Sequence, residues 1–341
     1  MIEVQGSPLS GMTFIDLFAG LGGFRLALES LGASCVYSSE WDKQAQNVYQ
    51  ENFGECPNGD ITQVDEKTIP NHDICCAGFP CQAFSISGKM RGFEDSRGTL
   101  FFDVARIVKE KKPKVVFMEN VRNFARHDGG RTLKVVQKTM EDLGYAFYWK
   151  VLSALDYGVP QKRERVYMVC FRKDCFCGAE GASAGASCEI NFEFPKPIPL
   201  ARHVEDFLLP ESDETLALCD ERYPMTFNPK KKEKYSAKAI KLAIVNKGGQ
   251  GERVYSTKGI AVTLSAYGGG VFAKTGGYLV NGKPRRLHPR ECARLMGYPD
   301  SYKISKRPNQ AYKQFGNSVV VDVLQFIALQ IAAALGTDGQ N

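Results

Sequence analysis

The sequence has no long uninterrupted apolar run and nothing that resembles a leader peptide. No run reaches the roughly 18 apolar residues of a membrane span. Residues 1–18 lack the basic start and the continuous apolar core of a secretory signal. These absences predict a cytoplasmic protein without a membrane partner. The 341 residues are 43% hydrophobic and 24% charged, which suits one large domain or two unequal ones with a proper core.

The sequence also lacks the paired cysteine spacings of disulfide or zinc frameworks. Several of its eleven cysteines, such as Cys75 and Cys170, stand in apolar strand-like runs, and a reducing compartment would keep them as thiols. Zinc binding by Cys175, Cys177 and Cys188 with Cys170 is conceivable, but a C-x-C pair among small residues is a weak signal, and we expect no metal site. The net charge of +6 mildly favours a polyanionic partner.

Short apolar runs alternate with helix-like segments through the first half of the chain. Periodic apolar positions over 23–31 and 131–143 indicate helices between buried strands. This alternation predicts an α/β fold with a doubly wound, mostly parallel sheet. The expected strands are 13–18, 34–39, 73–78, 114–120 and 165–171.

The alternation fails in the second half of the chain. Residues 173–189 are rich in small residues and indicate a surface insertion. Strands and glycine-rich turns then dominate, and 319–335 returns as a long apolar helix. We expect a large catalytic and cofactor domain over 1–205, a smaller β- and turn-rich recognition domain over 206–288, a hinge over 289–316, and a C-terminal segment, 317–341, that returns to the large domain.

A glycine-rich turn follows the first expected strand. In DLFAGLGGF, Gly20, Gly22 and Gly23 precede a helix, so backbone N–H groups can meet a ligand at the positive helix end. Glu40 closes the next strand about twenty residues later, where an acidic residue binds ribose hydroxyls in such folds. Spacing alone allows an NAD site, an S-adenosylmethionine site or an ordinary tight turn. Arg25 replaces the last glycine of the dinucleotide pattern and weakens the first of these.

Reactive side chains follow or begin three further strands. Cys81 lies just after one strand end, and Glu119 closes another. Gln161, Arg163 and Arg165 stand just before or at the start of a third. A nucleophilic cysteine needs nearby positive charge to become a thiolate, and a glutamate acts as an acid only if its pKa is raised. Together these residues indicate a catalytic site at the carboxyl edge of the sheet.

The segments DLFAGLGGF, GFPCQAFS, ENV, QKRER and QAYKQFGNSV occur in the order of the motifs of the cytosine-C5 DNA methyltransferases. The sequence resembles this family along nearly its whole length, and most strongly the GCGC-specific bacterial members. It departs from them at 173–189, 222–238 and 305–309. The resemblance implies an enzyme that transfers a methyl group from S-adenosylmethionine to cytosine C5 in double-stranded DNA. It would act as a monomer beside a cognate restriction endonuclease that is not a bound subunit.

The resemblance implies a role for each catalytic residue. The Cys81 thiolate would add to cytosine C6, and Glu119 would hold or protonate N3 so that negative charge does not accumulate on the ring. Arg165 would contact the cytosine O2, with Arg163 supporting that arrangement and Gln161 bracing the pocket. The target base would have to be flipped out of the duplex.

The resemblance also implies the residues that bind the cofactor. Phe18 and Trp41 would flank the adenine ring, and Asn317 would also brace the pocket. The full set is Phe18, Gly20, Leu21, Gly23, Glu40, Trp41, Asp60, Ile61, Pro80, Leu100, Tyr298, Asn317 and Val319.

The segment 247–270 resembles the recognition segment of the GCGC-specific members. Its glycines let the backbone approach base edges, Arg253 suits guanine O6 and N7, and Gln250 is long enough to enter the space left by the flipped base. A lid over 85–97 would close on that base. The expected DNA-contacting residues are Ser85, Ser87, Gln250, Arg253, Thr263, Ser265, Tyr267, Gly269 and Gly270.

Three other functions share part of this pattern. A nicotinamide-dependent oxidoreductase would share the glycine loop but gives no role to Cys81 with Glu119 and Arg165. An RNA cytosine methyltransferase would share the catalytic motifs, and only the recognition segment argues against it. A binding module with a dead active site is disfavoured because every catalytic residue named above is present.

Overall fold

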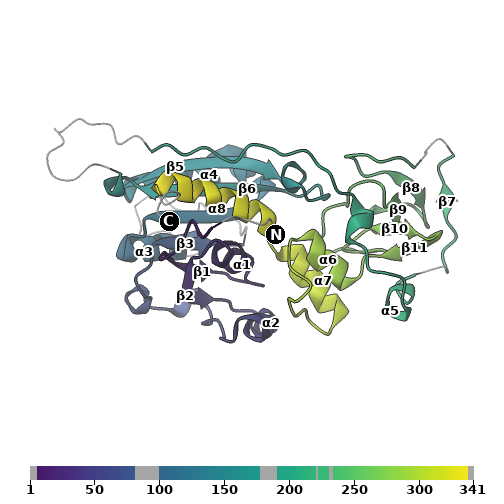
Figure 1. The fold of residues 1–341 in the computed structure, drawn as a ribbon, viewed down its shortest axis with the longest axis horizontal. Helices are drawn as coiled ribbons and strands as arrows, with labels where there is room; N and C mark the ends of the chain where they lie inside the picture. The colour runs from purple at the N-terminus through teal and green to yellow at the C-terminus, as the bar shows by residue number, and fades with distance from the viewer. Residues whose placement is uncertain (1–5, 81–99, 177–189, 220–221, 230–232, 337–341) are drawn as a thin grey trace.

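The computed structural model describes residues 6–80, 100–176, 190–219, 222–229 and 233–336. These residues form two lobes side by side, each built on its own β-sheet (Figure 1). The large lobe carries a six-stranded sheet, and the small lobe a five-stranded sheet. Two helices, α6 (Pro289–Leu295) and α7 (Pro308–Asn317), lie where the lobes meet (Figure 1).

The large sheet confirms the expected α/β architecture. Its strands are β1 (Thr13–Leu17), β2 (Ser34–Ser39), β3 (Ile74–Ala77), β4 (Val115–Val121), β5 (Tyr145–Ser153) and β6 (Glu164–Arg172). They are ordered β2-β1-β3-β4-β6-β5, with the first four parallel and β6 antiparallel to both neighbours. All five expected strands are present, each within one residue of its expected bounds. Strand β5 was missed although it begins with the apolar run YAFYW, and its side chains are largely half-exposed in the structure.

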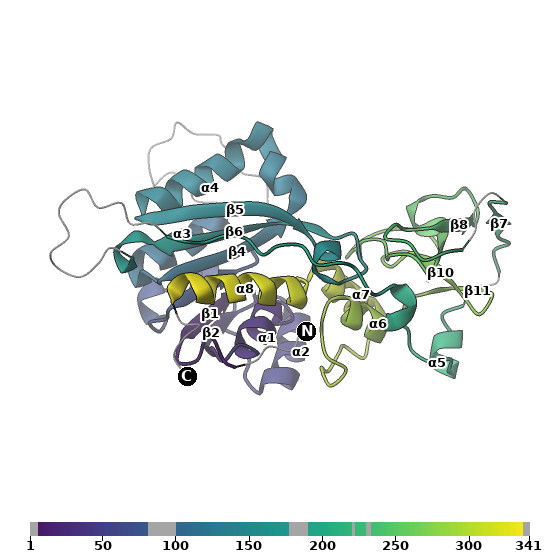
Figure 2. The same ribbon diagram turned by 45° about the horizontal axis from the view of Figure 1, so that its top comes forward.

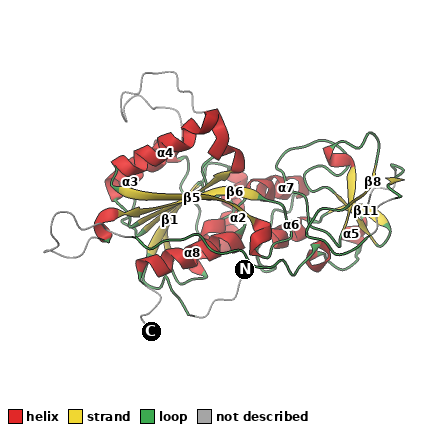
Figure 3. Ribbon diagram, turned by 90° about the horizontal axis from the view of Figure 1, so that it is seen from above, coloured by secondary structure: helices red, strands yellow, loops and turns green. Residues whose placement is uncertain are grey.

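Helices cover both faces of the large sheet (Figures 2 and 3). Successive strand residues face opposite sides, so that Phe14 packs in one apolar cluster with α1 and α8, and Ile15 in another with α3 and α4. Because both faces of the sheet are covered by helices, both sets of strand side chains are buried, and the strand sequences are nearly continuously apolar. The helices of this lobe are α1 (Gly23–Glu29), α2 (Lys43–Phe53), α3 (Leu100–Lys111), α4 (Arg131–Asp142) and α8 (Val321–Leu335).

The stretch Pro308–Leu335 is long and apolar enough to cross a membrane by length and composition, with a mean hydropathy of 2.0 in its most apolar window. In the structure it is broken between α7 and α8, and 56% of that window is buried inside the fold. Asp322 and Gln325 are buried within α8. In the sequence, these two polar residues interrupt the apolar run of this helix. We assign α8 to the core of the large lobe and α7 to the packing between the lobes.

The small lobe consists mainly of strands and turns, as its sequence indicates. Its sheet has the order β11-β10-β9-β8-β7, in which only the β9–β10 pair is parallel within the described residues. The elements are α5 (Asp213–Leu216), β7 (Thr226–Phe227), β8 (Lys241–Ile244), β9 (Arg253–Ser256), β10 (Gly277–Val280) and β11 (Lys283–Arg286). Helices α6 and α7 occupy most of the region that we had described only as a hinge.

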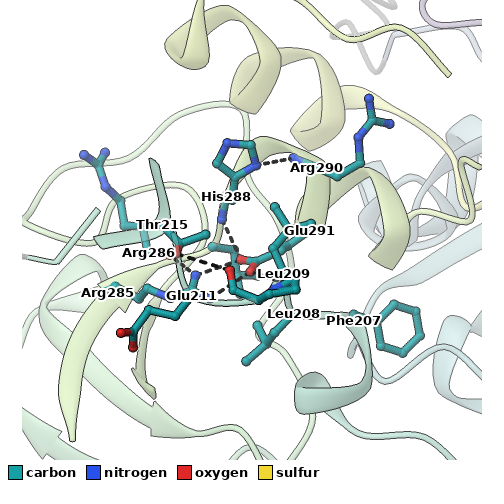
Figure 4. Close-up of polar contacts among 12 residues, drawn as sticks. Phe207, Leu208, Leu209, Glu211, Thr215, Arg285, Arg286, His288, Arg290 and Glu291 are labelled. Atoms are coloured by element: carbon teal, nitrogen blue, oxygen red, sulfur yellow. Dashed lines mark hydrogen bonds and ion pairs between the residues drawn. The ribbon is translucent and has the colours of Figure 1, made fainter. Parts of the chain in front are cut away.

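A buried ion pair joins the two places where the chain passes between the lobes (Figure 4). The Arg285 guanidinium donates one 2.8 Å hydrogen bond to each carboxylate oxygen of Glu291. The backbone N–H groups of Leu209 and His288 donate to the same carboxylate at 2.8 and 2.7 Å. Arg294, one turn further along α6, donates to the Leu208 carbonyl at 3.1 Å. These contacts hold the segment entering the small lobe against the segment leaving it.

We expect Glu291→Leu to lower the free energy of unfolding by about 3–5 kcal/mol, because Arg285 would keep a buried charge without its partner. The double variant Arg285→Met/Glu291→Leu should recover part of this loss by removing the unpaired charge, whereas the Leu209 and His288 N–H groups lack their acceptor in both variants. Urea unfolding of the single and double variants measures both values. A double variant no more stable than the single one would show that the pair is not the source of the effect.

Candidate active site

The glycine-rich turn lies at the carboxyl end of β1, as expected. Gly20 and Gly22 have positive φ angles of 54° and 70°, a region that glycine enters without strain. Glu40 follows β2 and reaches across to this turn, where its Oε2 accepts a 2.8 Å hydrogen bond from the Gly20 N–H. Its Oε1 accepts from the Asp42 N–H at 2.8 Å. Glu40 therefore fixes the turn and keeps lone pairs free for a ligand hydroxyl.

Residues from the far end of the chain meet the same turn. A side chain at Gly23 would place its Cβ 2.4 Å from Val319 Cγ2 and 3.0 Å from the Tyr298 hydroxyl. Tyr298 in turn shares a 2.6 Å hydrogen bond with Ser318 Oγ. The fold thus brings Tyr298 and Val319 against the first turn of α1, while Asn317 is exposed at the end of α7.

Asp16 is a residue of this region that sequence analysis missed. It lies on β1, is 1% exposed, and neither carboxyl oxygen has a hydrogen-bond partner among the described residues. Burial raises its pKa well above the usual range, and Arg25 opposes that shift. A buried carboxyl without a partner beside a ligand-binding turn suits a cationic group of the ligand. Asp16 stands within the DLFAG segment, where we had read it only as part of a strand.

The aromatic and loop residues expected around an adenosine lie on the same side. Trp41, next to Glu40, is 75% exposed, which is unusual for so large an apolar ring and suits one face of a planar ligand. Asp60 caps a short 3₁₀ turn, Ile61–Gln63, by accepting from the Thr62 N–H at 3.0 Å. Ile61 is buried, and Arg106 of α3 donates to its carbonyl at 2.6 Å. Of the other expected residues, Phe18 and Leu100 are half-buried at the ends of β1 and α3, and Leu21 is buried in the turn.

The expected acid and one of the expected guanidiniums form a close pair. Glu119 on β4 and Arg165 on the neighbouring β6 approach to 3.0 Å between Oε1 and Nε. Burial raises the pKa of Glu119, and Arg165 and Arg163 oppose that rise. A carboxyl in this setting exchanges a proton closer to neutral pH than an exposed one.

The strand that carries Glu119 also holds the segment leading to the expected nucleophile. Asn120 Nδ2 donates to the Phe79 carbonyl at 2.9 Å, and Pro80 follows as an exposed residue. Cys81 comes directly after Pro80 and lies outside the described residues, as do Ser85 and Ser87. The described part of the site therefore ends one residue before the thiol.

Arg163 and Gln161 are buried, and their hydrogen bonds are made with residues other than Glu119. Arg163 Nη2 donates to the Gly316 carbonyl at 3.0 Å and to the Ser318 carbonyl, and Nη1 donates to the Leu264 carbonyl at 3.1 Å. Gln161 Nε2 donates to the Leu295 carbonyl at 3.2 Å. Burial lowers the pKa of Arg163. Of the two arginines, the structure therefore places only Arg165 in contact with the Glu119 carboxyl.

The expected DNA-contacting residues of the small lobe lie on loops around β9. Gln250 is exposed just before β9, and Arg253 begins that strand and donates to the Gly248 carbonyl at 3.2 Å. A second loop packs tightly on the first, since a side chain at Gly251 would place its Cβ 2.1 Å from the Gly269 carbonyl oxygen. Gly270 has a positive φ of 97° at the same contact.

Three further expected contacts lie on the segment that leads into the second loop. Thr263 is exposed and donates to the Lys162 carbonyl through its hydroxyl. Ser265 Oγ donates to the Tyr267 carbonyl, and the Tyr267 ring is 73% exposed. The segment therefore presents polar groups and one aromatic ring on its outer side.

The cysteines of the possible zinc site are only partly described. Cys170 is buried in β6, and burial raises the pKa of its thiol well above the usual value. Cys175 is exposed, whereas Cys177 and Cys188 lie outside the described residues. In the ranges that the structure covers, no three His, Cys, Asp or Glu residues are grouped so as to hold a metal ion.

Comparisons with known proteins assign the chain to a family. The family described as C-5 cytosine-specific DNA methylase matches residues 12–333. The chain is 66% identical to the Type II methyltransferase M.HhaI of Haemophilus parahaemolyticus over 98% of both chains. It is 42% identical to the Type II methyltransferase M.HpaII of Haemophilus parainfluenzae over 98% of this chain and 94% of that protein.

A solved structure has the same fold. The S. pombe Dnmt2 methyltransferase superposes with a TM-score of 0.69 at 20% identity, covering 96% of this chain and 100% of the other. The match includes both lobes, and it agrees with an S-adenosylmethionine-dependent methyltransferase fold for the large one. With the family model covering nearly the whole chain, the protein belongs to the C-5 cytosine-specific DNA methylases, enzymes that transfer a methyl group from S-adenosylmethionine to cytosine.

Proposed function

We propose that the enzyme is the modification half of a Type II restriction-modification system and methylates the first cytosine of GCGC. Two of its relatives carry the name Type II methyltransferase. The observation that carries the target sequence is the segment 247–270, which resembles the recognition segment of GCGC-specific family members. Its loops present Gln250, Arg253 and Tyr267 at the surface around a close glycine contact.

The catalytic roles follow from the site and from the resemblance. The Cys81 thiolate adds to C6 of the flipped cytosine, and Glu119 protonates or hydrogen-bonds N3 as charge develops on the ring. Arg165 holds the Glu119 carboxyl and lies ready to bind the cytosine O2. The cofactor supplies an electrophilic methyl group. Loss of the C5 proton then expels Cys81 and restores the ring.

The cofactor is held by residues around the β1 turn. Glu40 binds the ribose, Phe18 and Trp41 flank the adenine, and Asp16 faces the cationic part of the molecule. The unpartnered Asp16 carboxyl and the exposed Trp41 ring support this placement. The remaining residues of the set are Gly20, Leu21, Gly23, Asp60, Ile61, Pro80, Leu100, Tyr298, Asn317 and Val319.

The surroundings of the enzyme are also part of the proposal. It acts as a cytoplasmic monomer on double-stranded DNA, with a cognate endonuclease that does not bind it as a subunit. Its domains are a catalytic domain over 1–205, a recognition domain over 206–288, a hinge over 289–316 and a returning segment over 317–341. The two separate sheets and the packing of α8 on the large lobe support this division.

Bisulfite sequencing of plasmid DNA from cells expressing the enzyme tests the target. We expect conversion-resistant cytosines at the first C of GCGC. Arg253→Ala should weaken binding to that site by about 1–3 kcal/mol and relax discrimination at one guanine, since a forked guanine contact is lost. The control is Lys283→Ala, which removes a positive charge from β11, two strands from the β9 strand that carries Arg253. It should leave the discrimination between bases unchanged. Methylation at CCGG or GGCC instead would show that the recognition segment has another target.

A further inference from the structure

One residue of the recognition segment, Leu264, is held by its backbone between two buried side chains of the large lobe. Gln161 Oε1 accepts a 3.2 Å hydrogen bond from the Leu264 N–H. Arg163 Nη1 donates to the Leu264 carbonyl at 3.1 Å. All three residues are buried. Both the N–H and the carbonyl of Leu264 are bound. The segment therefore cannot slide along its own axis or move sideways without breaking a hydrogen bond.

The neighbouring backbone is held in the same way. Residues 160–162 run beside Ala261, whose N–H donates to the Pro160 carbonyl at 2.6 Å. The Lys162 N–H donates to the Ala261 carbonyl at 3.3 Å. The recognition segment therefore docks beside the chain that continues directly into β6, the strand that carries Arg165.

Helix α7 closes the other side of the segment. A side chain at Gly316 would place its Cβ 2.2 Å from the Ala266 nitrogen and 2.3 Å from the Ser265 carbonyl carbon. Arg163 also binds the Gly316 carbonyl at 3.0 Å. The segment is thus enclosed between α7 and residues 161–163, with no room for a side chain at the closest approach.

Side chains that flank Leu264 point the other way. Thr263 and Tyr267 are exposed, and both belong to the set expected to contact DNA. A shift of the Leu264 backbone would move them relative to the Glu119–Arg165 pair, which lies on β4 and β6, and β6 begins directly after Arg163. Displacements of about 1 Å can change rates by about a hundredfold when reacting groups must be aligned.

We infer that Gln161 and Arg163 are positioning residues that set sequence specificity through the Leu264 backbone. They align the base-reading segment with the pocket for the target cytosine, so that correct bases bring the substrate into reach of Glu119. Neither side chain needs to touch DNA for this role. Both bind backbone groups of Leu264, and their other contacts are with Leu295, Met296, Gly316 and Ser318. This inference rests on the proposed role of 247–270 in recognition.

The test compares Gln161→Met with a matched control, Gln325→Met. Both glutamines are fully buried, but Gln325 lies on α8 and donates a 2.7 Å hydrogen bond to the hydroxyl of Ser30, which ends α1 in the large lobe. For each enzyme kcat/KM is measured on duplexes with the cognate site and with single-base changes. The cognate site is the one that plasmid mapping assigns to the wild type. If the mapped target is not GCGC, the proposed specificity is refuted, but the role of Gln161 can still be tested on the mapped site.

We expect Gln161→Met to lose about tenfold or more of the cognate preference, whereas Gln325→Met keeps the wild-type ratio. Affinity for S-adenosylhomocysteine without DNA should be the same in all three enzymes. An unchanged ratio in Gln161→Met would overturn the inference, because a merely structural glutamine costs stability and not discrimination. Should Gln161→Met fail to fold, Arg163→Lys is measured by the same ratio, since lysine has one nitrogen and lacks the fork by which Nη1 binds Leu264 and Nη2 binds Gly316 and Ser318.

Discussion

The Cys81→Ser variant should lose methyl transfer by on the order of 10³-fold or more, while its affinity for S-adenosylhomocysteine stays at the wild-type value. A serine hydroxyl is a far poorer nucleophile than a thiolate near neutral pH. The described structure supports the location, because Asn120 on the Glu119 strand binds the Phe79 carbonyl, two residues before Cys81. Single-turnover transfer to duplex DNA and equilibrium binding of S-adenosylhomocysteine measure the two quantities.

The control for this prediction is Cys175→Ser. Cys175 is an exposed thiol of the same lobe and lies after β6, outside the proposed site. It should keep full activity, which would show that exchanging sulfur for oxygen elsewhere has no effect. Substantial turnover by Cys81→Ser would end the proposal of a covalent intermediate at this residue.

The second large effect is expected for Glu119→Gln, which should lower the single-turnover rate by about 10²–10⁴-fold with little change in DNA affinity. Glutamine keeps the shape and can donate a hydrogen bond, but it cannot transfer a proton to the cytosine ring. Because burial raises the pKa of Glu119, part of the population stays protonated at a higher pH than for an exposed carboxyl. The wild-type rate should therefore fall as pH rises through that pKa, and Glu119→Gln should lack this limb.

Glu164→Gln is the matched control for Glu119→Gln. Glu164 begins the strand that carries Arg165, but its carboxylate is partly exposed and pairs with Arg122 at 2.6 Å. Its loss should change the rate little, since exposed pairs contribute little. Equal losses in the two variants would indicate a general effect of charge on the strand rather than a role for the Glu119 carboxyl.

The first half of the fold and part of the site could be predicted because the signals are local. An apolar run followed by glycines marks β1 and its turn, and adjacent strand ends explain why Glu119 and Arg165 meet at one edge. The family assignment also rules out the nicotinamide-dependent oxidoreductase as the function of the glycine loop.

Other features could not be predicted because they depend on contacts or on exposure. Strand β5 is largely half-exposed, which its apolar run YAFYW does not reveal, and Asp16 is unusual only because no described group binds its carboxyl. The side chains of Gln161 and Arg163 bind the backbone of Leu264, about a hundred residues further along the sequence. No local sequence pattern indicates such a contact. The expected role of both residues in the catalytic pocket stays a prediction, to which the structure adds their hydrogen bonds with Leu264 of the recognition segment.

The close approach of Gly316 to the backbone at Ser265 and Ala266 bears on how such an enzyme could acquire a new target sequence. A grafted recognition segment must keep the backbone path at 261–266, because a bulge there would collide with α7 or deprive the buried Arg163 of its Leu264 acceptor. The loops around Gly251 and Gly269 pack on each other, and their contact with α7 is a hydrogen bond from the Lys274 side chain to the Asn309 carbonyl. Divergence among descendants of this protein should therefore accumulate at the loop tips, while the docking stretch beneath them is inherited unchanged.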